Sequence, residues 1–349
     1  MKIGLVGLPG SGKTTCFRVL SGRHHADTHH GSTVATVPLP DSRLDEIARL
    51  EKPRTHTYAD VTFVDFEALR ANRPGGKELA LHTVSGDVDA FALIVQCFGS
   101  VDREGNPFDP ADDLDTLMLA MVLSDLAIIE KHLESLNKGP RAERTPQRMD
   151  LMHRCRDQLS AGKPLRQSRF TSEERRYLSG FRPLSLMPIL VVCNVAEDDL
   201  KGAKASSTVK GASALGLPHL VLCAELEEEL SQLPADEQQA FLEDYGLEAA
   251  ARDRFVQACF ALLDLLVFYT VNQAEARGWT LRRGSTAYEA AGRVHSDLQA
   301  GFVRAEITPF GALAEGGSLH ACKEKGFTRV EGKDYVVQDG DVLQVRFSR

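Results

Sequence analysis

Short apolar runs recur along the first two thirds of the chain, with helical or irregular segments between them. Residues 1–7 form one near-continuous apolar run, and further runs cover residues 61–64, 91–98, 189–193 and 219–223. Apolar runs of this length that alternate with helical segments are typical of the buried strands of a parallel sheet. The pattern therefore predicts an α/β fold built on a parallel sheet.

A long helical pattern interrupts this alternation between the runs at 91–98 and 189–193. Shorter helical patterns at 147–159 and 172–178 follow the Gly139-Pro140 break, so we expect a helical hairpin at 114–182 that projects from a core made of residues 1–113 and 183–270. The long helix is predicted because its apolar residues recur at spacings of three and four. These residues are Leu114, Leu117, Met118, Met121, Val122, Leu126, Ile129, Leu133 and Leu136.

The chain changes character in its last part, residues 271–349. A strand and turn are predicted at 279–286, a helix at 287–298, and a strand–turn–strand pattern at 335–337, 339–341 and 342–347. These elements predict a small α+β module after the parallel-sheet core.

The charge of the chain is unevenly distributed. The formal net charge of −8 argues against a uniformly basic nucleic-acid-binding protein. Residues 131–182, however, contain thirteen Lys or Arg and six Asp or Glu, a formal charge of +7. Because phosphate backbones are bound mainly by Lys and Arg, this basic arm is a candidate surface for the ribosome or a structured RNA. The alternative is an ordinary solvated helical face.

Cysteine spacing and hydropathy favour a cytoplasmic protein. The seven cysteines form no C-x-x-C pair, which predicts neither a disulfide framework nor a zinc ribbon. No charge-free run approaches the roughly 20 residues of a membrane span, and the opening strand-like segment is unlike a signal peptide. We therefore expect no membrane association, and we expect a monomer.

Residues 7–14 match the phosphate-binding pattern G-x-x-x-x-G-K-[ST] at the predicted strand-to-helix turn. Backbone N–H groups of the loop would surround the phosphates, Lys13 would reach the β- and γ-phosphate oxygens, and the Thr14 hydroxyl would bind Mg²⁺. The alternative is a chance glycine-rich turn. The predicted nucleotide contacts in the loop are Gly7, Pro9, Gly10, Ser11, Gly12, Lys13, Thr14 and Thr15.

Three later strand ends carry the remaining site candidates. Asp65 follows the run at 61–64, where a carboxylate on the Mg²⁺ side of the site is needed. Asn194 and Glu197 follow the run at 189–193, where a nucleotide-binding fold reads its base, and a Glu there leaves the choice of base open. The next strand end supplies further candidates for contacts to the base, namely Cys223, Ala224 and Glu225.

With these residues in view, the sequence resembles the YchF/Obg-like ATPases, as a divergent member. The resemblance extends over essentially the whole chain. The matching segments are GLPGSGKTT, VPLPDSRLDEIARLEKP, VTFVDFEAL, NVAED, CAELEEEL, WTLRRGSTAYEAAGRVHSDLQAGFVRAE and EGKDYVVQDGDVLQVRF.

The resemblance implies a P-loop NTPase with an inserted helical arm and a C-terminal TGS domain of ubiquitin-like fold at 271–349. It also implies a ribosome-associated nucleotide hydrolase that binds ATP, often with GTP as a weaker ligand. Asn194 and Glu197 match the family's base motif. Val195 stands in place of the usual Lys and so removes an aliphatic stem that GTPases lay on guanine, which is consistent with tolerance of adenine.

The chain departs from this family at positions that bear on hydrolysis. Ala68 replaces the glycine of switch II, and Leu69 stands where Ras-like GTPases place a glutamine that orients water. The family's loop histidine implicated in hydrolysis has no counterpart at 99–108. The water-activating residue is therefore unassigned, and we expect slow turnover.

The first switch segment also differs from the family pattern. Thr28 is a candidate second Mg²⁺ ligand under one of two alignments that differ by one residue. Two His pairs at 24–25 and 29–30 would suit a transition metal, and the alternative is a polar loop with incidental histidines.

Two functions follow from these observations. The first is slow Mg²⁺-dependent hydrolysis of ATP or GTP by a ribosome- or RNA-associated regulatory NTPase, with the basic arm and the TGS domain as contact surfaces. The second is a nucleotide-binding regulatory module with negligible hydrolysis. A metabolic kinase is poorly supported, although the arm contains several arginines.

Overall fold

The computed structural model describes residues 1–22, 27–29, 32–66, 88–101, 105, 107–138, 144–247 and 249–348. The chain forms two compact units. One unit consists of Met1, residues 36–62 and residues 260–349, and the other of residues 2–35 and 63–259. Among the described residues, no helix combines the length and hydropathy that a membrane span requires.

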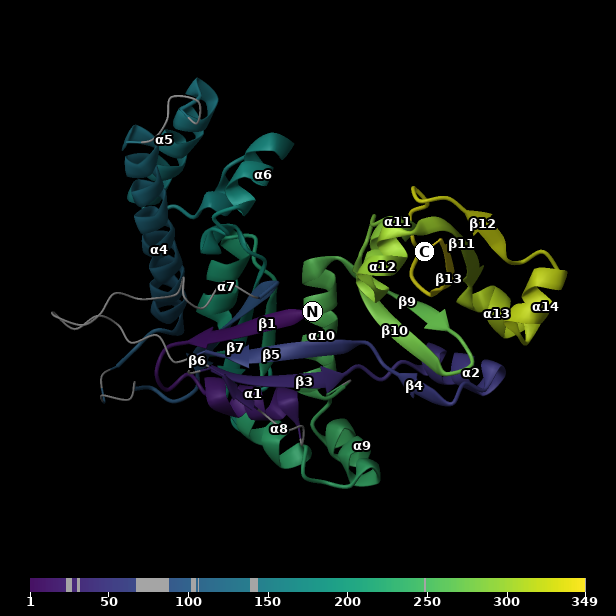
Figure 1. The fold of residues 1–349 in the computed structure, drawn as a ribbon. Coiled ribbons are helices and arrows are strands. Elements are labelled where there is room, and N and C mark those ends of the chain that lie inside the picture. Colours follow the sequence, from purple (N-terminus) through teal and green to yellow (C-terminus); the bar gives the residue numbers. More distant parts are fainter. Residues whose placement is uncertain are drawn as a thin grey trace. The chain divides into compact units, whose positions relative to one another are not determined.

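A mainly parallel sheet of seven strands contains the N-terminal strand (Figure 1). Its order is β2-β3-β5-β1-β6-β7-β8, with β1, β6, β7 and β8 paired in parallel and β2 and β3 antiparallel. The strands are β1 (Lys2–Gly7), β2 (Asp27–His29), β3 (Ser32–Pro38), β5 (Asp60–Asp65), β6 (Ala90–Cys97), β7 (Ile189–Val195) and β8 (His219–Leu222).

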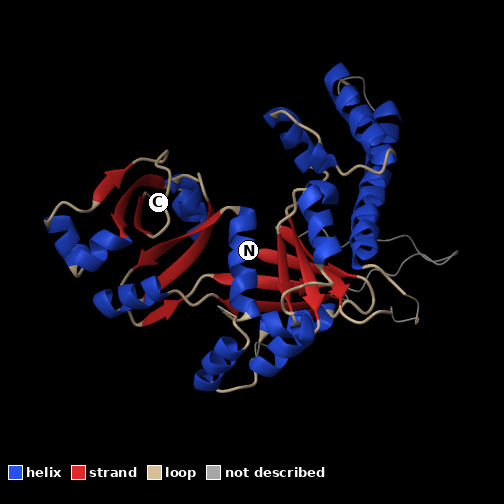
Figure 2. Ribbon diagram, turned by 180° about the vertical axis from the view of Figure 1, so that it is seen from behind, coloured by secondary structure: helices blue, strands red, loops and turns tan. Residues whose placement is uncertain are grey.

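The expected α/β fold with a parallel sheet is confirmed. Every residue of β6 and β7 is buried, as a strand covered on both faces requires. Helices lie on both sides of the sheet (Figure 2). Outside the arm they are α1 (Lys13–Ser21), α7 (Ser206–Ala214), α8 (Ala224–Leu230), α9 (Ala235–Asp244) and α10 (Ala251–Leu263).

The inserted arm consists of α4 (Pro110–Lys138), α5 (Pro146–Ser160) and α6 (Ser172–Ser179). A 3-10 turn at Leu165–Gln167 lies between α5 and α6, and another at Leu184–Leu186 lies between α6 and β7. Its helices match the predicted helical patterns. A cluster of buried side chains from α4, α5 and α6 forms its core. Buried Asp125 on α4 accepts backbone N–H bonds from Leu184 and Ser185 at 2.7 and 2.8 Å, which fixes the point where the chain returns to the sheet.

The other unit contains a six-stranded sheet in the order β12-β11-β13-β9-β10-β4. Its strands are β4 (Thr55–Thr57), β9 (Leu265–Val271), β10 (Glu275–Arg282), β11 (Phe302–Pro309), β12 (Arg329–Glu331) and β13 (Asp341–Phe347). Its helices are α2 (Ser42–Glu51), α11 (Ala287–Val294), α12 (Ser296–Ala300), α13 (Phe310–Gly316) and α14 (Leu319–Glu324).

Helix α2 packs with the C-terminal residues, although it belongs to the N-terminal part of the sequence. Leu44 and Ile47 are fully buried in one cluster with Tyr269, Leu313 and Val342. The compact unit therefore takes in residues 36–62 and begins again at residue 260, whereas the expected domain boundaries place 36–62 in the nucleotide-binding core and start the last domain at 271. The grouping follows from burial of the apolar face of α2.

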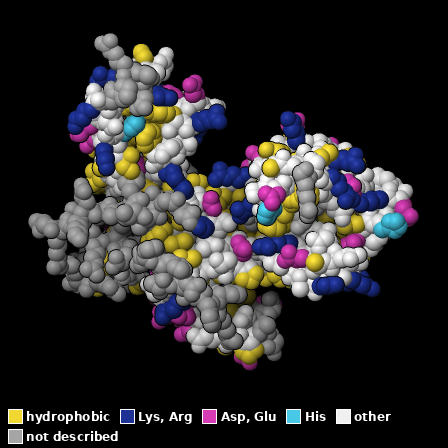
Figure 3. All heavy atoms as spheres, viewed as in Figure 1, with side chains coloured by type: hydrophobic (Ala, Val, Ile, Leu, Met, Phe, Trp, Pro, Cys, Tyr) yellow, Lys and Arg dark blue, Asp and Glu magenta, His cyan; other side chains and the backbone are white. Residues whose placement is uncertain are grey.

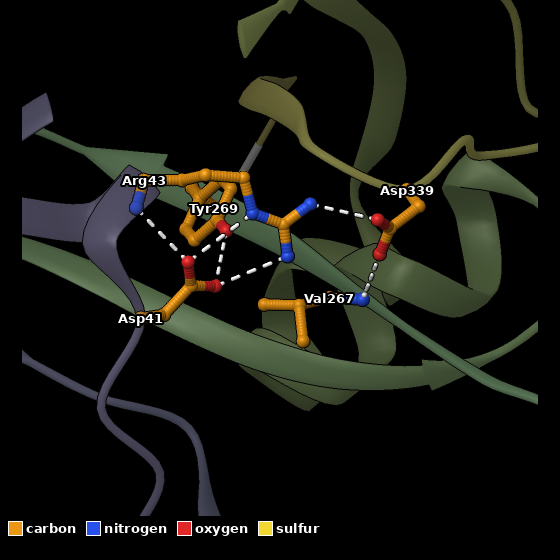
Figure 4. Close-up of polar contacts among 5 residues, drawn as sticks. All are labelled: Asp41, Arg43, Val267, Tyr269 and Asp339. Carbon is orange, nitrogen blue, oxygen red and sulfur yellow. Dashed lines mark hydrogen bonds and ion pairs between the residues drawn. The ribbon is translucent and has the colours of Figure 1, made fainter. Parts of the chain in front are cut away.

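Polar contacts reinforce this packing at the start of α2 (Figure 4). The Asp41 carboxylate accepts bonds from the backbone N–H of Arg43 at 3.0 Å and from the Tyr269 hydroxyl at 2.5 Å. Arg43 Nη1 donates to Asp339 at 2.7 Å, and Asp339 in turn accepts the backbone N–H of Val267 at 2.8 Å. Two carboxylates and one guanidinium thus join α2 to β9 and to the turn before β13.

One predicted strand of the C-terminal module does not form. Residues 335–337 make only an isolated bridge, between Val336 and Thr286. The carbonyl of Tyr335 accepts the N–H of Ala287, and the N–H of Val337 bonds to Ser285. These backbone groups are satisfied by the turn before α11, so the segment does not extend a sheet.

We predict that Asp41 stabilises the protein in a pH-dependent way. Burial opposes ionisation, but hydrogen bonds from Arg43 and Tyr269 outweigh it and lower the pKa of Asp41. Its contribution is therefore complete above the unfolded-state pKa and is lost as the pH falls through the lower folded-state value. Asp41→Asn should lower the free energy of unfolding by about 1–2 kcal/mol at pH 7, with a smaller difference below about pH 4.

Urea unfolding of both proteins from pH 7 to pH 2 measures this difference. Asp334→Asn is the control, because Asp334 is exposed in the same unit. A difference that stays constant down to pH 2 would contradict the prediction.

Candidate functional site

The loop between β1 and α1 has the geometry of a phosphate-binding loop. Gly12 precedes α1 with φ of 80°, a left-handed conformation that favours glycine. A Cβ at Gly12 would lie 2.2 Å from Nδ2 of Asn194, and one at Gly7 would lie 2.5 Å from Oγ of Ser11. Both glycines therefore allow close approach of the backbone, and the N-terminal N–H groups of α1 end this loop, where an anion is favoured.

Lys13 is buried at the first position of α1, with 7% of its surface exposed. Its ammonium group pairs with the Asp65 carboxylate at the end of β5 and donates to the carbonyl of Phe66 at 2.5 Å. The structure thus brings together the predicted phosphate-binding lysine and the predicted carboxylate on the Mg²⁺ side of the site.

The hydroxyl groups of the loop could bind Mg²⁺ together with a phosphate group. The Ser11 Oγ atom is buried and has no hydrogen-bond partner among the described residues. Thr14 is exposed, Thr15 is half-buried, and Asp65 is partly exposed. Hydroxyl and carboxylate oxygens are ligands that suit Mg²⁺, so the donor set present fits this ion.

Asn194 connects the phosphate loop to the start of α8, where base contacts were predicted. Its side chain is buried at the end of β7, where Nδ2 donates to the Ser11 carbonyl at 3.0 Å and Oδ1 accepts the Ala224 N–H at 2.9 Å. An amide nitrogen carries two hydrogens, so one remains for another acceptor. Asn194 therefore positions the loop and retains a donor.

The other predicted base contacts lie around this amide. Glu197 begins the 3-10 turn Glu197–Asp199 and is exposed, as is Glu225 on α8. Cys223 and Ala224 are buried at the start of α8, and burial raises the pKa of the Cys223 thiol. Cys223 is therefore a neutral packing group at this turn.

Tyr245, which follows α9, is a residue that the sequence pattern did not indicate. Its hydroxyl donates to Oε1 of Glu197 at 2.5 Å. The two residues are 48 positions apart, and a tyrosine at a helix end has no local signal that marks such a contact.

Several predicted features fall outside the described structure. Ala68, Leu69 and the histidines at 24, 25 and 30 are outside the described residues, and the loop at 99–108 is described only in part. Thr28 lies on β2, but its side chain is not described. In the described part of the chain, no group of three or more His, Cys, Asp or Glu residues could hold a metal ion.

Lys and Arg side chains are spread over the visible face of the helical arm (Figure 3). Some are neutralised, since Arg154 pairs with Asp150 and Glu174, and Arg156 pairs with Asp157. Other cations are exposed and have no ion pair with a described residue. These are Lys131, Lys163, Arg169, Arg175 and Arg176.

A glycine-rich loop between the first strand of a parallel sheet and its helix, with a buried lysine facing a strand-end carboxylate, defines a P-loop NTPase. The comparisons with known proteins identify the group within this class. The chain is 31% identical over 360 residues to the "Ribosome-binding ATPase YchF" of Bacillus subtilis, with 99% of this chain and 98% of that protein covered. It is 32% identical over 359 residues to the Haemophilus influenzae protein of the same name, with 99% of each covered.

The structure and the C-terminal segment agree with this match. The Schizosaccharomyces pombe YchF GTPase has a similar fold, with a TM-score of 0.82 at 24% identity over 99% of this chain and 97% of that one. Residues 265–348 match the family model YchF-GTPase_C, described as "Protein of unknown function (DUF933)". The chain belongs to the YchF family, which confirms the resemblance stated from the sequence.

We predict that Asn194→Ala lowers the free energy of unfolding by about 1–3 kcal/mol, because it leaves two buried backbone groups, Ser11 O and Ala224 N–H, without partners. Urea unfolding measures the loss. Glu225→Gln is the control, since this exposed side chain lies in the same turn. A loss equal to that of the control would show that the amide does not hold the loop.

Proposed function

We propose that this protein binds a purine nucleoside triphosphate, ATP or possibly GTP, with Mg²⁺ and hydrolyses it slowly as a ribosome-associated regulatory NTPase in the cytoplasm. The observation that carries the proposal is Lys13, held at the N-terminus of α1 beside Asp65. The names of the relatives, "Ribosome-binding ATPase YchF", support both the nucleotide and the partner.

Each part of the proposed site has a separate task. The loop N–H groups and Lys13 would bind the phosphates, and Asn194 would keep the loop in register with the base side of the site. Thr14 and Asp65 would hold Mg²⁺, with Thr28 as a further candidate, and the ion would neutralise phosphate charge. Glu197 and the turn at Cys223, Ala224 and Glu225 would contact the base.

Phosphate binding would draw on the ammonium group of Lys13. Its ammonium group is engaged by Asp65 and the Phe66 carbonyl, and both acceptors lie where β5 ends. An ammonium group has three donor hydrogens, so one remains for a phosphate oxygen while the other two stay with Asp65 and the Phe66 carbonyl. Phosphate binding is thereby linked to the start of the segment that contains Ala68.

The second candidate function is a nucleotide-binding module with negligible hydrolysis. Ala68, Leu69 and the lack of a histidine at 99–108 favour it, because these positions supply no group that orients water. The two candidates differ only in turnover.

We predict single-turnover hydrolysis of ATP by the wild-type protein that is at least about tenfold faster than by Lys13→Ala, because Lys13 stabilises charge on the phosphates. Rapid-quench measurement at saturating Mg²⁺ gives both rates. Thr14→Ala is a second variant, since its exposed side chain poses little risk to folding, and it should raise the Mg²⁺ concentration that gives the half-maximal rate. Equal rates in wild type and Lys13→Ala would leave the binding module as the function.

We further propose that the ribosome or a structured RNA contacts the basic arm at 131–182 together with the TGS domain at 271–349, and that the protein is a monomer in solution. The exposed arginines of α6 support this, because Arg175 and Arg176 have no ion pair with a described residue. Exposed cations without an ion pair can bind phosphates and release the counterions of a nucleic-acid backbone.

We predict that the double substitution Arg175→Glu and Arg176→Glu weakens ribosome binding by about tenfold or more at physiological salt and reduces the dependence of log K on log salt by about 2. Co-sedimentation across a salt series measures both quantities. Lys201→Glu with Lys204→Glu is the matched control, since both lysines are exposed and lie outside the arm. Equal losses in the two pairs would refute a specific role of the arm.

A further inference from the structure

The carboxylate of Glu197 has a partner supplied by another part of the chain. Glu197 follows β7 three positions after Asn194 and is exposed. Its Oε1 atom accepts the Tyr245 hydroxyl at 2.5 Å. One oxygen of this carboxylate is therefore engaged within the protein, and the other has no hydrogen bond with a described residue.

Tyr245 is held in place by the helix that precedes it. Its backbone N–H bonds to the carbonyl of Phe241 at 3.1 Å, and its ring stacks on the Phe241 ring with centroids 4.6 Å apart and planes inclined by 19°. Phe241 packs against the buried cluster of the parallel sheet. The hydroxyl is thus supported through Phe241 by the same core that supports β7.

We infer that Tyr245 is a positioning residue that biases the proposed site toward adenine by occupying one oxygen of Glu197. The inference rests on the proposed function, in which Glu197 contacts the base.

The chemistry of the two bases explains the direction of this bias. Guanine presents two adjacent N–H groups, which pair best with both oxygens of one carboxylate. Adenine presents a single amine donor beside an acceptor nitrogen, so one free carboxylate oxygen is enough for it. A carboxylate whose Oε1 already accepts a phenol O–H retains its full capacity for one donor and loses part of its capacity for two.

The phenol is suited to remain a donor. Its hydrogen bond to Glu197 raises the pKa of Tyr245, and burial and the charges of Glu197, Glu229 and Asp244 act in the same direction. Tyr245 therefore stays protonated at neutral pH.

The test is calorimetric titration of the full-length protein with Mg²⁺-ATP and Mg²⁺-GTP, which gives the ratio of the GTP Kd to the ATP Kd. Tyr245→Phe removes the hydroxyl and keeps the stacked ring, and it should lower this ratio about 3- to 10-fold, the net effect of one ordinary hydrogen bond. Tyr288→Phe is the matched control, because Tyr288 is an exposed tyrosine of the other unit that also packs on a phenylalanine.

A second comparison separates positioning from a structural role. Glu197→Ala removes the acceptor of the tyrosine hydroxyl from an exposed position that poses little risk to folding, and in this background Tyr245→Phe should leave the ratio unchanged. The inference is supported if Tyr245→Phe lowers the ratio in the wild-type background and leaves it unchanged in the Glu197 variant.

Two results would overturn it. An unchanged ratio in Tyr245→Phe, which includes an equal loss of affinity for both nucleotides, would show that the tyrosine does not select the base. If the wild-type protein binds neither nucleotide, the proposed function fails and the inference fails with it. Binding that Lys13→Ala abolishes, together with an unchanged ratio in Tyr245→Phe, refutes the inference and leaves the proposed function standing.

Discussion

The amide of Asn194 is the contact on which the candidate site depends. It is buried at the end of β7 and joins the carbonyl of Ser11 to the N–H of Ala224, so that one side chain spans the phosphate loop and the start of α8. A short amide can reach both sides only because Gly12 has no Cβ, which would lie 2.2 Å from its nitrogen. The loop glycine and the strand-end asparagine thus require each other, and they set the distance between the phosphate and base sides of the site.

The charged side chains of the candidate site and those of the arm differ in how they are paired. Lys13 lies beside Asp65 in a largely buried pair, whereas the arm combines neutralised arginines such as Arg154 with exposed ones such as Arg175. Pairing inside the site holds its charges in fixed positions, and the unpaired charges of the arm are open to a large polyanion. The net charge of −8 is therefore an average over parts with opposite charge, and it does not argue against a partner rich in RNA.

The departures from the sequence-based expectations have a common physical origin. Residues 36–62 were expected in the nucleotide-binding core with the rest of 1–113, yet Leu44 and Ile47 of α2 are buried with Tyr269. The bond between Asp41 and Tyr269 joins residues 228 positions apart. Periodicity shows that a helix has an apolar face, but it does not show which distant surface covers that face. Residues 335–337 have strand-like composition, and their backbone groups are satisfied by a turn instead of a sheet.

The sequence by itself determined strands β1, β5, β6, β7 and β8, the long helix of the arm, the phosphate loop and the family, because each depends on residues that are near one another in the chain. Lys13, Asp65, Asn194 and Glu197 were all found at strand or helix ends, where local patterns place functional groups. Only the tertiary structure decided that α2 packs with the C-terminal residues, that Asn194 bridges two loops, and that Tyr245 engages Glu197. The physical reason is that such contacts form between chain segments brought together by burial of apolar surface, and no local spacing of residues specifies them.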